Sequence, residues 1–311
     1  MNFPLISIII PTYKRSVSLI SHAVQSALAQ TYSEIEIIIV DDNASASLAN
    51  YRAEVSLYIS NLIKTNKNII LVQNQKNLGG SLSRNEGIKF SHGEFITFLD
   101  DDDEFLPFKV EHQINFMLKN NLNFSFTDLT IYNKKNETID KRIHNDIVSF
   151  EKRDLLKYHL TKQITSTETL MISKELLVEI GGFDDAKMGQ EFYLVCKLIK
   201  SPSSVIGYFV SDDIKAYRTN IEAISTGKNK IVGEKELYKY KKTYFKILTY
   251  KERNYIRTRH RAVMAIAYLR NKKIFPASWF LLMAFFTNPY ISIKEALMLN
   301  KKKKKTKLVK K

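Results

Sequence analysis

The chain has 311 residues, of which 44% are hydrophobic, and its single cysteine excludes a disulfide framework. The formal net charge of +16 indicates an anionic partner, a class that includes nucleic acid, anionic lipid and phosphorylated substrates. Many of the lysines lie beyond residue 228, and the run 301–305 is equally typical of a solvated tail. No signal peptide is expected, because the first apolar run begins almost at Met1.

Four short apolar, β-branched runs in the first third of the chain predict strands that are buried on both faces. They are residues 5–10, 35–40, 69–72 and 95–99. Apolar residues at helical spacing lie between the first two runs, at 17–28, and again at 83–90. This alternation predicts a doubly wound α/β fold with a mainly parallel sheet, whose ligands bind at the carboxyl ends of the strands.

Further elements follow downstream, and the polar stretch 133–165 gives no clear pattern. The predicted helices are 107–119, 174–180 and 191–200, and the predicted strands are 123–132, 168–172 and 205–210. Beyond residue 228 the pattern becomes helical, with basic and aromatic residues interleaved over 234–248, 252–271, 276–286 and 290–299. The most apolar piece, 277–286, is shorter than the ~20 residues that span a bilayer, so it is either a core helix or one lying in a membrane interface.

The most informative feature is a run of four aspartates, 100–103, directly after the predicted strand 95–99. Four adjacent carboxylates repel one another and destabilise a fold unless positive charge lies among them. A divalent cation shared with a substrate phosphate is one source of that charge. The alternative is a solvated acidic turn before a helix N-terminus.

Four sequence blocks resemble, in order and spacing, the family 2 inverting glycosyltransferases of the GT-A fold. The blocks are Ser7–Tyr13, Glu36–Ser45, Asn77–Gly87 and Gly93–Asp103, and the resemblance continues through Gly181–Asp184. It implies a GT-A fold, with a mainly parallel, Rossmann-like sheet flanked by helices. It also implies transfer of a sugar, with inversion, from a nucleotide-diphosphate donor, preferably UDP-linked, to an acceptor hydroxyl. Mn²⁺ or Mg²⁺ would stabilise the leaving diphosphate.

The resemblance also implies roles for the residues that bind the donor and the metal. It implies that Asp102 is the direct metal ligand and that Asp100 and Asp101 contact the ribose and a metal-bound water. Asp103 receives no role in binding and is interpreted as the start of the next helix. For the nucleotide, it implies three residues around the base, a carboxylate on the base edge and an arginine near the diphosphate; these are Pro11, Thr12, Tyr13, Asp42 and Arg84. The alternative for Arg84 is an ordinary arginine on a helix surface.

The general base that the resemblance implies is Glu191, because it stands where the family carries an aspartate. Gln190 replaces the acid that usually precedes that base. Asp184 and Asp185 are competing candidates, and a plain helix N-terminus is the alternative reading of Glu191. A histidine that the family often carries after a Tyr-Arg pair is replaced by Asn220.

The sequence thus predicts a catalytic domain over 1–227, a basic helical extension over 228–300 and a lysine-rich tail over 301–311. The expected partners are a nucleotide sugar, a glycan or lipid-linked acceptor, and an anionic membrane surface at the cytoplasmic face. Nucleic acid is not expected, because acidic strand ends repel phosphate backbones. A pyrophosphorylase-type enzyme would need a glycine-rich loop after the first strand, which is missing. Another alternative is a catalytically weak, transferase-like partner subunit, which only the Glu-for-Asp exchange at Glu191 supports.

Overall fold

The computed structural model describes residues 3–133, 135–164, 166–186, 188–217 and 228–293. They form two compact units. The first lies within residues 1–152, 164–185 and 190–219 and holds both β-sheets. The second combines residues 153–163 and 186–189 with the helices that begin at residue 228. The predicted boundary at 227 and the predicted tail 301–311 lie outside the described residues.

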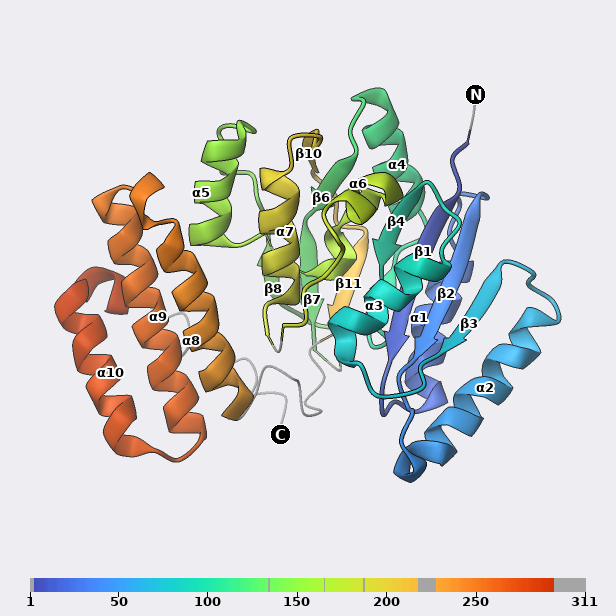
Figure 1. The fold of residues 1–311 in the computed structure, drawn as a ribbon, viewed down its shortest axis with the longest axis horizontal. Coiled ribbons are helices and arrows are strands. Elements are labelled where there is room, and N and C mark those ends of the chain that lie inside the picture. The colour runs from blue at the N-terminus through green and yellow to red at the C-terminus, as the bar shows by residue number, and fades with distance from the viewer. Residues whose placement is uncertain (1–2, 134, 165, 187, 218–227, 294–311) are drawn as a thin grey trace. The chain divides into compact units, whose positions relative to one another are not determined.

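The larger sheet of the first unit has seven strands in the order β10-β6-β9-β4-β1-β2-β3 (Figure 1). Their bounds are β1 Ile6–Thr12, β2 Ile35–Asp41, β3 Ile69–Gln73, β4 Phe95–Phe98, β6 Phe124–Thr127, β9 Met171–Ser173 and β10 Ile206–Phe209. All pairings are parallel except those of β9, which is antiparallel to β4 and β6. The predicted α/β fold with a mainly parallel sheet is therefore confirmed.

A second sheet of four strands has the order β5-β11-β7-β8. Its strands are β5 Glu104–Phe105, β7 Leu129–Tyr132, β8 Thr138–Arg142 and β11 Ile214–Tyr217. Because β5 follows the four aspartates directly and β11 pairs with it, this sheet fixes the far end of the acidic loop.

The isoleucines of β1 show why this strand lies at the centre of the fold. Ile8 and Ile10 belong to the core cluster that contains the buried residues of α1 (Val17–Leu28). A Cβ added to Gly87 of α3 (Gly79–Phe90) would meet Ile9 Cγ2 at 2.5 Å, so α3 packs closely on the intervening residue. Since successive strand residues point to opposite faces, α1 and α3 cover opposite faces of the sheet (Figure 1).

The remaining helical elements of the described chain up to residue 217 are η1 Ala46–Leu48, α2 Ala49–Ile63, α4 Lys109–Lys119, α5 Lys152–Lys162, η2 Thr167–Thr169, α6 Lys174–Glu179 and α7 Gln190–Lys200. The predicted helices 107–119, 174–180 and 191–200 are confirmed as α4, α6 and α7. The sequence analysis missed α2, in which only Val55 and Ile59 are buried, and also missed β8 and α5.

Two strand predictions are wrong in their bounds. The predicted strand 123–132 is interrupted at Asp128, and its halves β6 and β7 belong to different sheets. The Asp128 carboxylate accepts hydrogen bonds from the Tyr208 hydroxyl at 2.5 Å and the His144 backbone N–H at 3.3 Å, so it fixes the break. The predicted strand 168–172 begins only at Met171, because residues 167–169 form a 3₁₀ turn after Ser166, whose φ is +86°.

The helices of the second unit after residue 227 are α8 Lys228–Thr243, η3 Phe245–Ile247, α9 Tyr250–Arg270 and α10 Ile274–Thr287. A capping box of Thr249 and Glu252 begins α9. The His260 ring of α9 stacks on Tyr238 of α8 with ring centroids 4.0 Å apart, and its Nδ1 lies 3.0 Å from the Glu234 carboxylate. The predicted helical extension is thus present, although residues 294–299 of its last helix lie outside the described residues.

None of the helices in the described part of the chain combines the length and the apolar character that crossing a bilayer requires.

Gly93 provides a test of how tightly β1 and β4 are joined. Its N–H donates to Ser7 Oγ at 3.0 Å and to Glu36 Oε1 at 3.1 Å. A Cβ added there would lie 2.7 Å from the Ser7 backbone N and 2.8 Å from the Leu5 carbonyl oxygen, and backbone atoms cannot move aside cheaply. We expect Gly93→Ala to lower the free energy of unfolding by ~2 kcal/mol or more in urea denaturation.

The control is Ser18→Ala on the exposed side of α1, which should stay within about 0.5 kcal/mol of the parent chain. Equal stability of the two variants would contradict the close approach at Gly93.

Candidate active site

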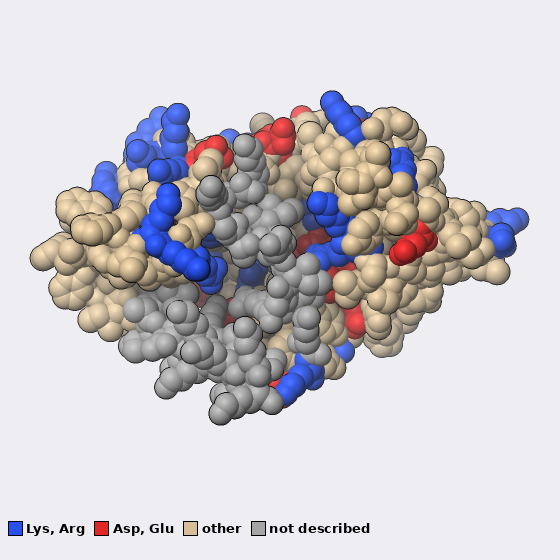
Figure 2. Space-filling model, turned by 90° about the horizontal axis from the view of Figure 1, so that it is seen from below, with Lys and Arg blue, Asp and Glu red and all other residues tan. Residues whose placement is uncertain are grey.

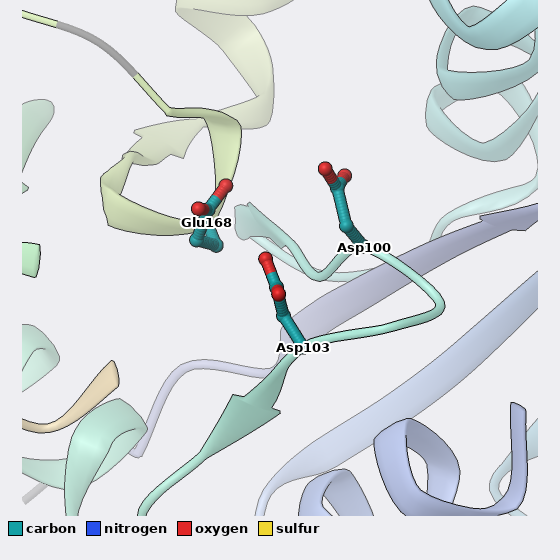
Figure 3. A group of neighbouring side chains, drawn as sticks. All are labelled: Asp100, Asp103 and Glu168. Carbon is teal, nitrogen blue, oxygen red and sulfur yellow. The ribbon is translucent and has the colours of Figure 1, made fainter. Parts of the chain in front are cut away.

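Three carboxylates meet beyond the carboxyl end of β4 (Figure 3). Asp100 and Asp103 come from the loop after β4, and Glu168 comes from the 3₁₀ turn η2, which faces that loop. One oxygen from each lies within 4.8 Å of the others. The loop is closed by the Asp103 N–H, which donates to the Asp100 carbonyl oxygen at 3.1 Å. Close carboxylate oxygens from three positions are the donor set that Mg²⁺ and Mn²⁺ prefer.

The group carries excess negative charge in a buried place. Glu168 is 3% exposed and Asp103 6% exposed. Burial, and then the neighbouring Asp100, raise the pKa of Glu168 to about 7. Burial, and then Glu168 and Asp100, raise the pKa of Asp103 well above its ordinary value. A cation among these oxygens would relieve both the burial penalty and the repulsion, so the three residues fit a divalent metal.

Arg84 of α3 brings a buried positive charge to this group. Its guanidinium forms an ion pair with Asp100, donates to Gln190 Oε1 at 3.0 Å and to the Gly80 carbonyl oxygen at 3.2 Å. It also lies over the Phe183 ring, 5.8 Å from the ring centroid. The alternative of a surface arginine is wrong, because Arg84 is only 7% exposed.

Asp101 and Asp102 point to a different partner, Arg15, which follows β1. Arg15 Nε donates to Asp101 Oδ1 at 3.1 Å, and Arg15 Nη2 donates to Asp102 Oδ2 at 3.0 Å. Burial raises the pKa of Asp101 to about 6, and the Arg15 charge opposes that rise. Consecutive aspartates therefore divide between two sites, and Asp102 lies outside the group of Asp100, Asp103 and Glu168. Its role as metal ligand stays a prediction.

Asp42 lies at the end of β2 and organises the loop that leads into α3. Its carboxylate accepts from the Leu78 N–H at 2.8 Å, the Gly79 N–H at 2.8 Å and Asn74 Nδ2 at 2.7 Å. Asp41 holds its own loop through Asn43. The contact of Asp42 with a base edge stays a prediction.

The residues expected around the base lie at the end of β1. Pro11 and Thr12 are the last residues of the strand, and Thr12 is 2% exposed. Tyr13 is 40% exposed, and the Lys14 ammonium lies 5.1 Å from its ring centroid. β1 lies between β2 and β4, so the chain switches direction across the sheet at this strand. Ligands of such sheets bind outside this switch point.

Glu191 lies in the first turn of α7, next to Gln190. Among the described residues its carboxylate accepts no hydrogen bond and forms no ion pair, so its oxygens are available to a proton. The start of α7 is tied to α3 through Gln190 and Arg84. Asp184, a competing base candidate, is engaged instead by Lys197 Nζ at 2.9 Å. Asn220 lies outside the described residues.

Asn85 fixes the turn before that region. Its side chain donates to the Phe183 carbonyl oxygen and accepts from the Phe183 N–H, each at 2.8 Å. Gly182 has φ +60°, and a Cβ there would lie 2.5 Å from Asn85 Oδ1, so glycine is required twice over.

Sequence reasoning missed Glu168, Arg15 and the place of Asp103 in the acidic group. Glu168 sits in the polar stretch 165–169, where nothing in the local pattern marks a buried acid. Arg15 is one of many basic residues, and only the return of the chain beside β1 brings it to the aspartates. The structure does bring together Arg84, Asp100 and Gln190 at the start of α7.

Comparison with known proteins gives relatives of one kind. A glycosyltransferase of Haemophilus influenzae, described as uncharacterized, is 38% identical over 148 residues, covering 46% of this chain and 56% of that protein. The UDP-Glc:alpha-D-GlcNAc-diphosphoundecaprenol beta-1,3-glucosyltransferase WfgD of Escherichia coli is 34% identical over 152 residues, covering 49% of this chain and 56% of WfgD. The putative teichuronic acid biosynthesis glycosyltransferase TuaG of Bacillus subtilis is 28% identical over 242 residues, covering 78% of this chain and 86% of TuaG. The chain thus spans little more than half the length of the first two.

The fold is also similar to solved structures. Residues 1–349 of S. aureus TarS in complex with UDP-GlcNAc match with a TM-score of 0.58 at 16% identity, covering 91% of each chain. At this identity the match concerns the fold alone. The model of the family described as Glycosyl transferase family 2 matches residues 7–181, which is more than half of the chain. The chain therefore belongs to glycosyl transferase family 2.

Proposed function

We propose that the chain transfers a sugar, with inversion, from a UDP-sugar to a hydroxyl of a lipid-linked glycan in cell-surface polysaccharide synthesis. The observation that carries this proposal is the acidic group of Asp100, Asp103 and Glu168, beside Arg84 at the carboxyl ends of the strands. The reaction class follows from membership of the family. WfgD and TuaG, whose names give a diphosphoundecaprenol acceptor and teichuronic acid synthesis, support the acceptor class.

The metal is the first part of the proposal. Asp100, Asp103 and Glu168 would hold Mn²⁺ or Mg²⁺, because their oxygens converge and burial makes the negative charges of Asp103 and Glu168 costly. The bound cation supplies the positive charge that stabilises the departing diphosphate. Asp102 is the competing ligand that the family resemblance designates, and the variants below separate the two assignments.

The donor is held by the residues around β1 and α3. Arg84 lies against Asp100, and its Nε has no hydrogen-bond partner among the described residues, so the guanidinium has capacity for a phosphate oxygen. The Tyr13 ring is exposed and available to stack on the base. We assign Pro11, Thr12 and Asp42 to the same nucleotide pocket, with Asp42 also holding the loop before α3. TarS, which has this fold, was crystallised with UDP and with UDP-GlcNAc.

The chemical step places Glu191 as the general base. The acceptor oxygen forms a bond to the anomeric carbon while the bond from that carbon to the β-phosphate oxygen breaks. The electron pair of the broken bond leaves with UDP, and the acceptor proton passes to the Glu191 carboxylate. Attack opposite the leaving group inverts the anomeric configuration. Among the described residues the Glu191 carboxylate has no partner, which supports this role, and the adjacent Gln190 accepts a hydrogen bond from Arg84 of the proposed donor site.

The proposed acceptor also sets where the reaction takes place. Nucleotide sugars are made in the cytoplasm, and a lipid-linked glycan presents its hydroxyls at the membrane. We therefore place the reaction at the inner face of the cell membrane.

The first test is release of UDP from a panel of UDP-sugars, with and without Mn²⁺ or Mg²⁺ and with an undecaprenyl-diphosphate-linked acceptor. We expect metal-dependent release from one donor, and a loss of ~100-fold or more in Glu191→Gln, because the acceptor proton then has no base. Calorimetry should show unchanged UDP binding in this variant. If the parent chain shows no metal-dependent binding of UDP, the proposal is contradicted. Full activity of Glu191→Gln would show that Glu191 is not the general base.

Glu168→Gln tests the acidic group through stability. The pKa of Glu168 is raised in the folded chain, so its favourable contribution is present below pH 4.5 and is lost as the pH rises through about 7. At pH 8 without metal we therefore expect Glu168→Gln to be more stable than the parent by ~1 kcal/mol or more, with a higher Tm in scanning calorimetry. At pH 4 the difference should vanish. Adding Mn²⁺ at pH 8 should raise the Tm of the parent far more than that of the variant.

Two further variants complete this test. Glu175→Gln, at an exposed position of α6, should match the parent throughout. If Asp102→Asn abolishes the Mn²⁺ effect while Glu168→Gln retains it, the metal belongs to Asp102 and the assignment to the acidic group is wrong.

Gln190→Glu tests the charge on Arg84. The parent Gln190 is a neutral acceptor, and among the described residues Arg84 forms its ion pair with Asp100. A carboxylate at this position would neutralise more of the Arg84 charge and so weaken its attraction for the diphosphate. We therefore expect affinity for UDP to fall by about tenfold, while affinity for uridine, which lacks phosphate, stays the same. Isothermal calorimetry measures both.

The matched control is Gln25→Glu, an exposed position of α1, which should bind UDP like the parent. An equal loss of UDP and uridine binding in Gln190→Glu would indicate a rearranged pocket rather than a change of charge at Arg84.

A further inference from the structure

Helix α10 has a composition that is unusual for a surface helix. Its 14 residues, Ile274–Thr287, include no charged side chain. One side packs on α9: Ala277 and Ala284 are buried, and the Phe280 ring stacks on Tyr268 at 5.6 Å. Arg261 of α9 donates to the Met283 carbonyl oxygen at 2.9 Å. A helix that is apolar all round normally lies inside a protein or a membrane.

The other side of α10 is exposed and carries the large side chains. Phe275 is 92% exposed, Trp279 63%, Leu282 53% and Phe286 77%. Their spacing of four, three and four residues places them in one stripe along the helix. Ile274, Leu281 and Phe285 widen the stripe, and Tyr290 continues beyond the helix end at 75% exposed. Contiguous apolar surface of this kind marks a binding face.

After Glu252, the charged side chains of α9 and of the turn into α10 are all positive. From Arg253 to Ile293 the sequence contains no Asp or Glu, whereas it contains seven Lys or Arg residues. Arg270, Lys272 and Lys273 are exposed in the turn between α9 and α10, directly before the stripe begins. In the space-filling view, the end of the second unit formed by these helices shows apolar or neutral surface with Lys and Arg beside it (Figure 2).

We propose that this face, the α10 stripe, docks on an anionic lipid bilayer, with the helix lying in the plane of the membrane interface. At 1.5 Å per residue α10 is ~21 Å long, shorter than the ~30 Å hydrocarbon core, so it lies along the surface instead of crossing it. Trp and Tyr favour the interfacial region, and the adjacent basic side chains reach lipid phosphates. A second copy of the chain is the other candidate occupant, which light scattering on the same samples tests.

This inference rests on the proposed function in one respect. It places the chain on the surface where a lipid-linked acceptor presents its hydroxyl, and so deepens the assignment of the acceptor class. Binding to lipid needs neither donor nor acceptor, so it can be measured independently of transfer.

The experiment is co-sedimentation of the full chain with phosphatidylcholine vesicles and with vesicles that also contain phosphatidylglycerol. We expect binding to the anionic vesicles that weakens with salt. The double variant Phe275→Gln with Phe286→Gln should lose about tenfold or more in partitioning, because two large apolar side chains no longer enter the interface. Both side chains are exposed, so the fold should be retained, which circular dichroism checks.

The matched control is Leu57→Gln, a 66% exposed apolar residue of α2, which should bind vesicles like the parent. Undiminished binding by the double variant would assign the lipid contact to the lysine-rich end of the sequence and overturn the proposal. So would failure of the parent to bind anionic vesicles together with a dimer, seen by light scattering, that the double variant dissociates. UDP binding by calorimetry on the same samples reports the donor site separately, so its loss would count against the proposed function and not against the docking face.

Discussion

Negative charge collected beyond β4 is the constraint on which the site depends. Four consecutive aspartates follow a buried strand, and a fifth carboxylate, Glu168, faces them from a separate turn. Two arginines at separate positions offset part of this repulsion. Arg15 takes Asp101 and Asp102, and Arg84 takes Asp100. Asp103 and Glu168 form none of these ion pairs, and burial together with the neighbouring carboxylates raises their pKa values. Buried carboxylates of this kind fit the proposed divalent cation, because a positive charge among them would offset both burial and repulsion.

The loops around this charge are held by backbone donors more than by packing. Asp42 gathers two N–H groups at the start of α3, Asp103 accepts from the Tyr217 N–H at 2.7 Å, and Asn85 pairs with both backbone groups of Phe183. Each contact joins loops that are distant in sequence but share the same edge of the sheet. The site is therefore rigid in its frame and polar in its lining, which suits a ligand with phosphates and hydroxyls.

Much of the frame could be predicted because its signals are local. The isoleucine runs of β1 and β2 and the aspartates after β4 are each read from adjacent residues, and their order and spacing identify the family. The missed features arise from contacts between distant residues. Glu168 becomes a buried acid only because η2 turns toward the β4 loop, and Asp128 breaks an apparently continuous strand only because Tyr208 and His144 hold its carboxylate. In α2 only two of 15 residues are buried, so its periodic signal is weak. The roles of Asp102 and Glu191 come from the resemblance and await the variants.

The alanines of α10 have a consequence for how this chain behaves in a test tube. Ala277 and Ala284 let α10 approach α9 closely, and Phe or Trp would not fit where they lie. The helix therefore cannot rotate about its axis to bury its large side chains, and its apolar side stays exposed in the folded chain. Purification in plain buffer keeps that side in water, where self-association and adsorption are the available ways to cover it. A detergent or lipid additive would cover this side and so limit self-association and adsorption.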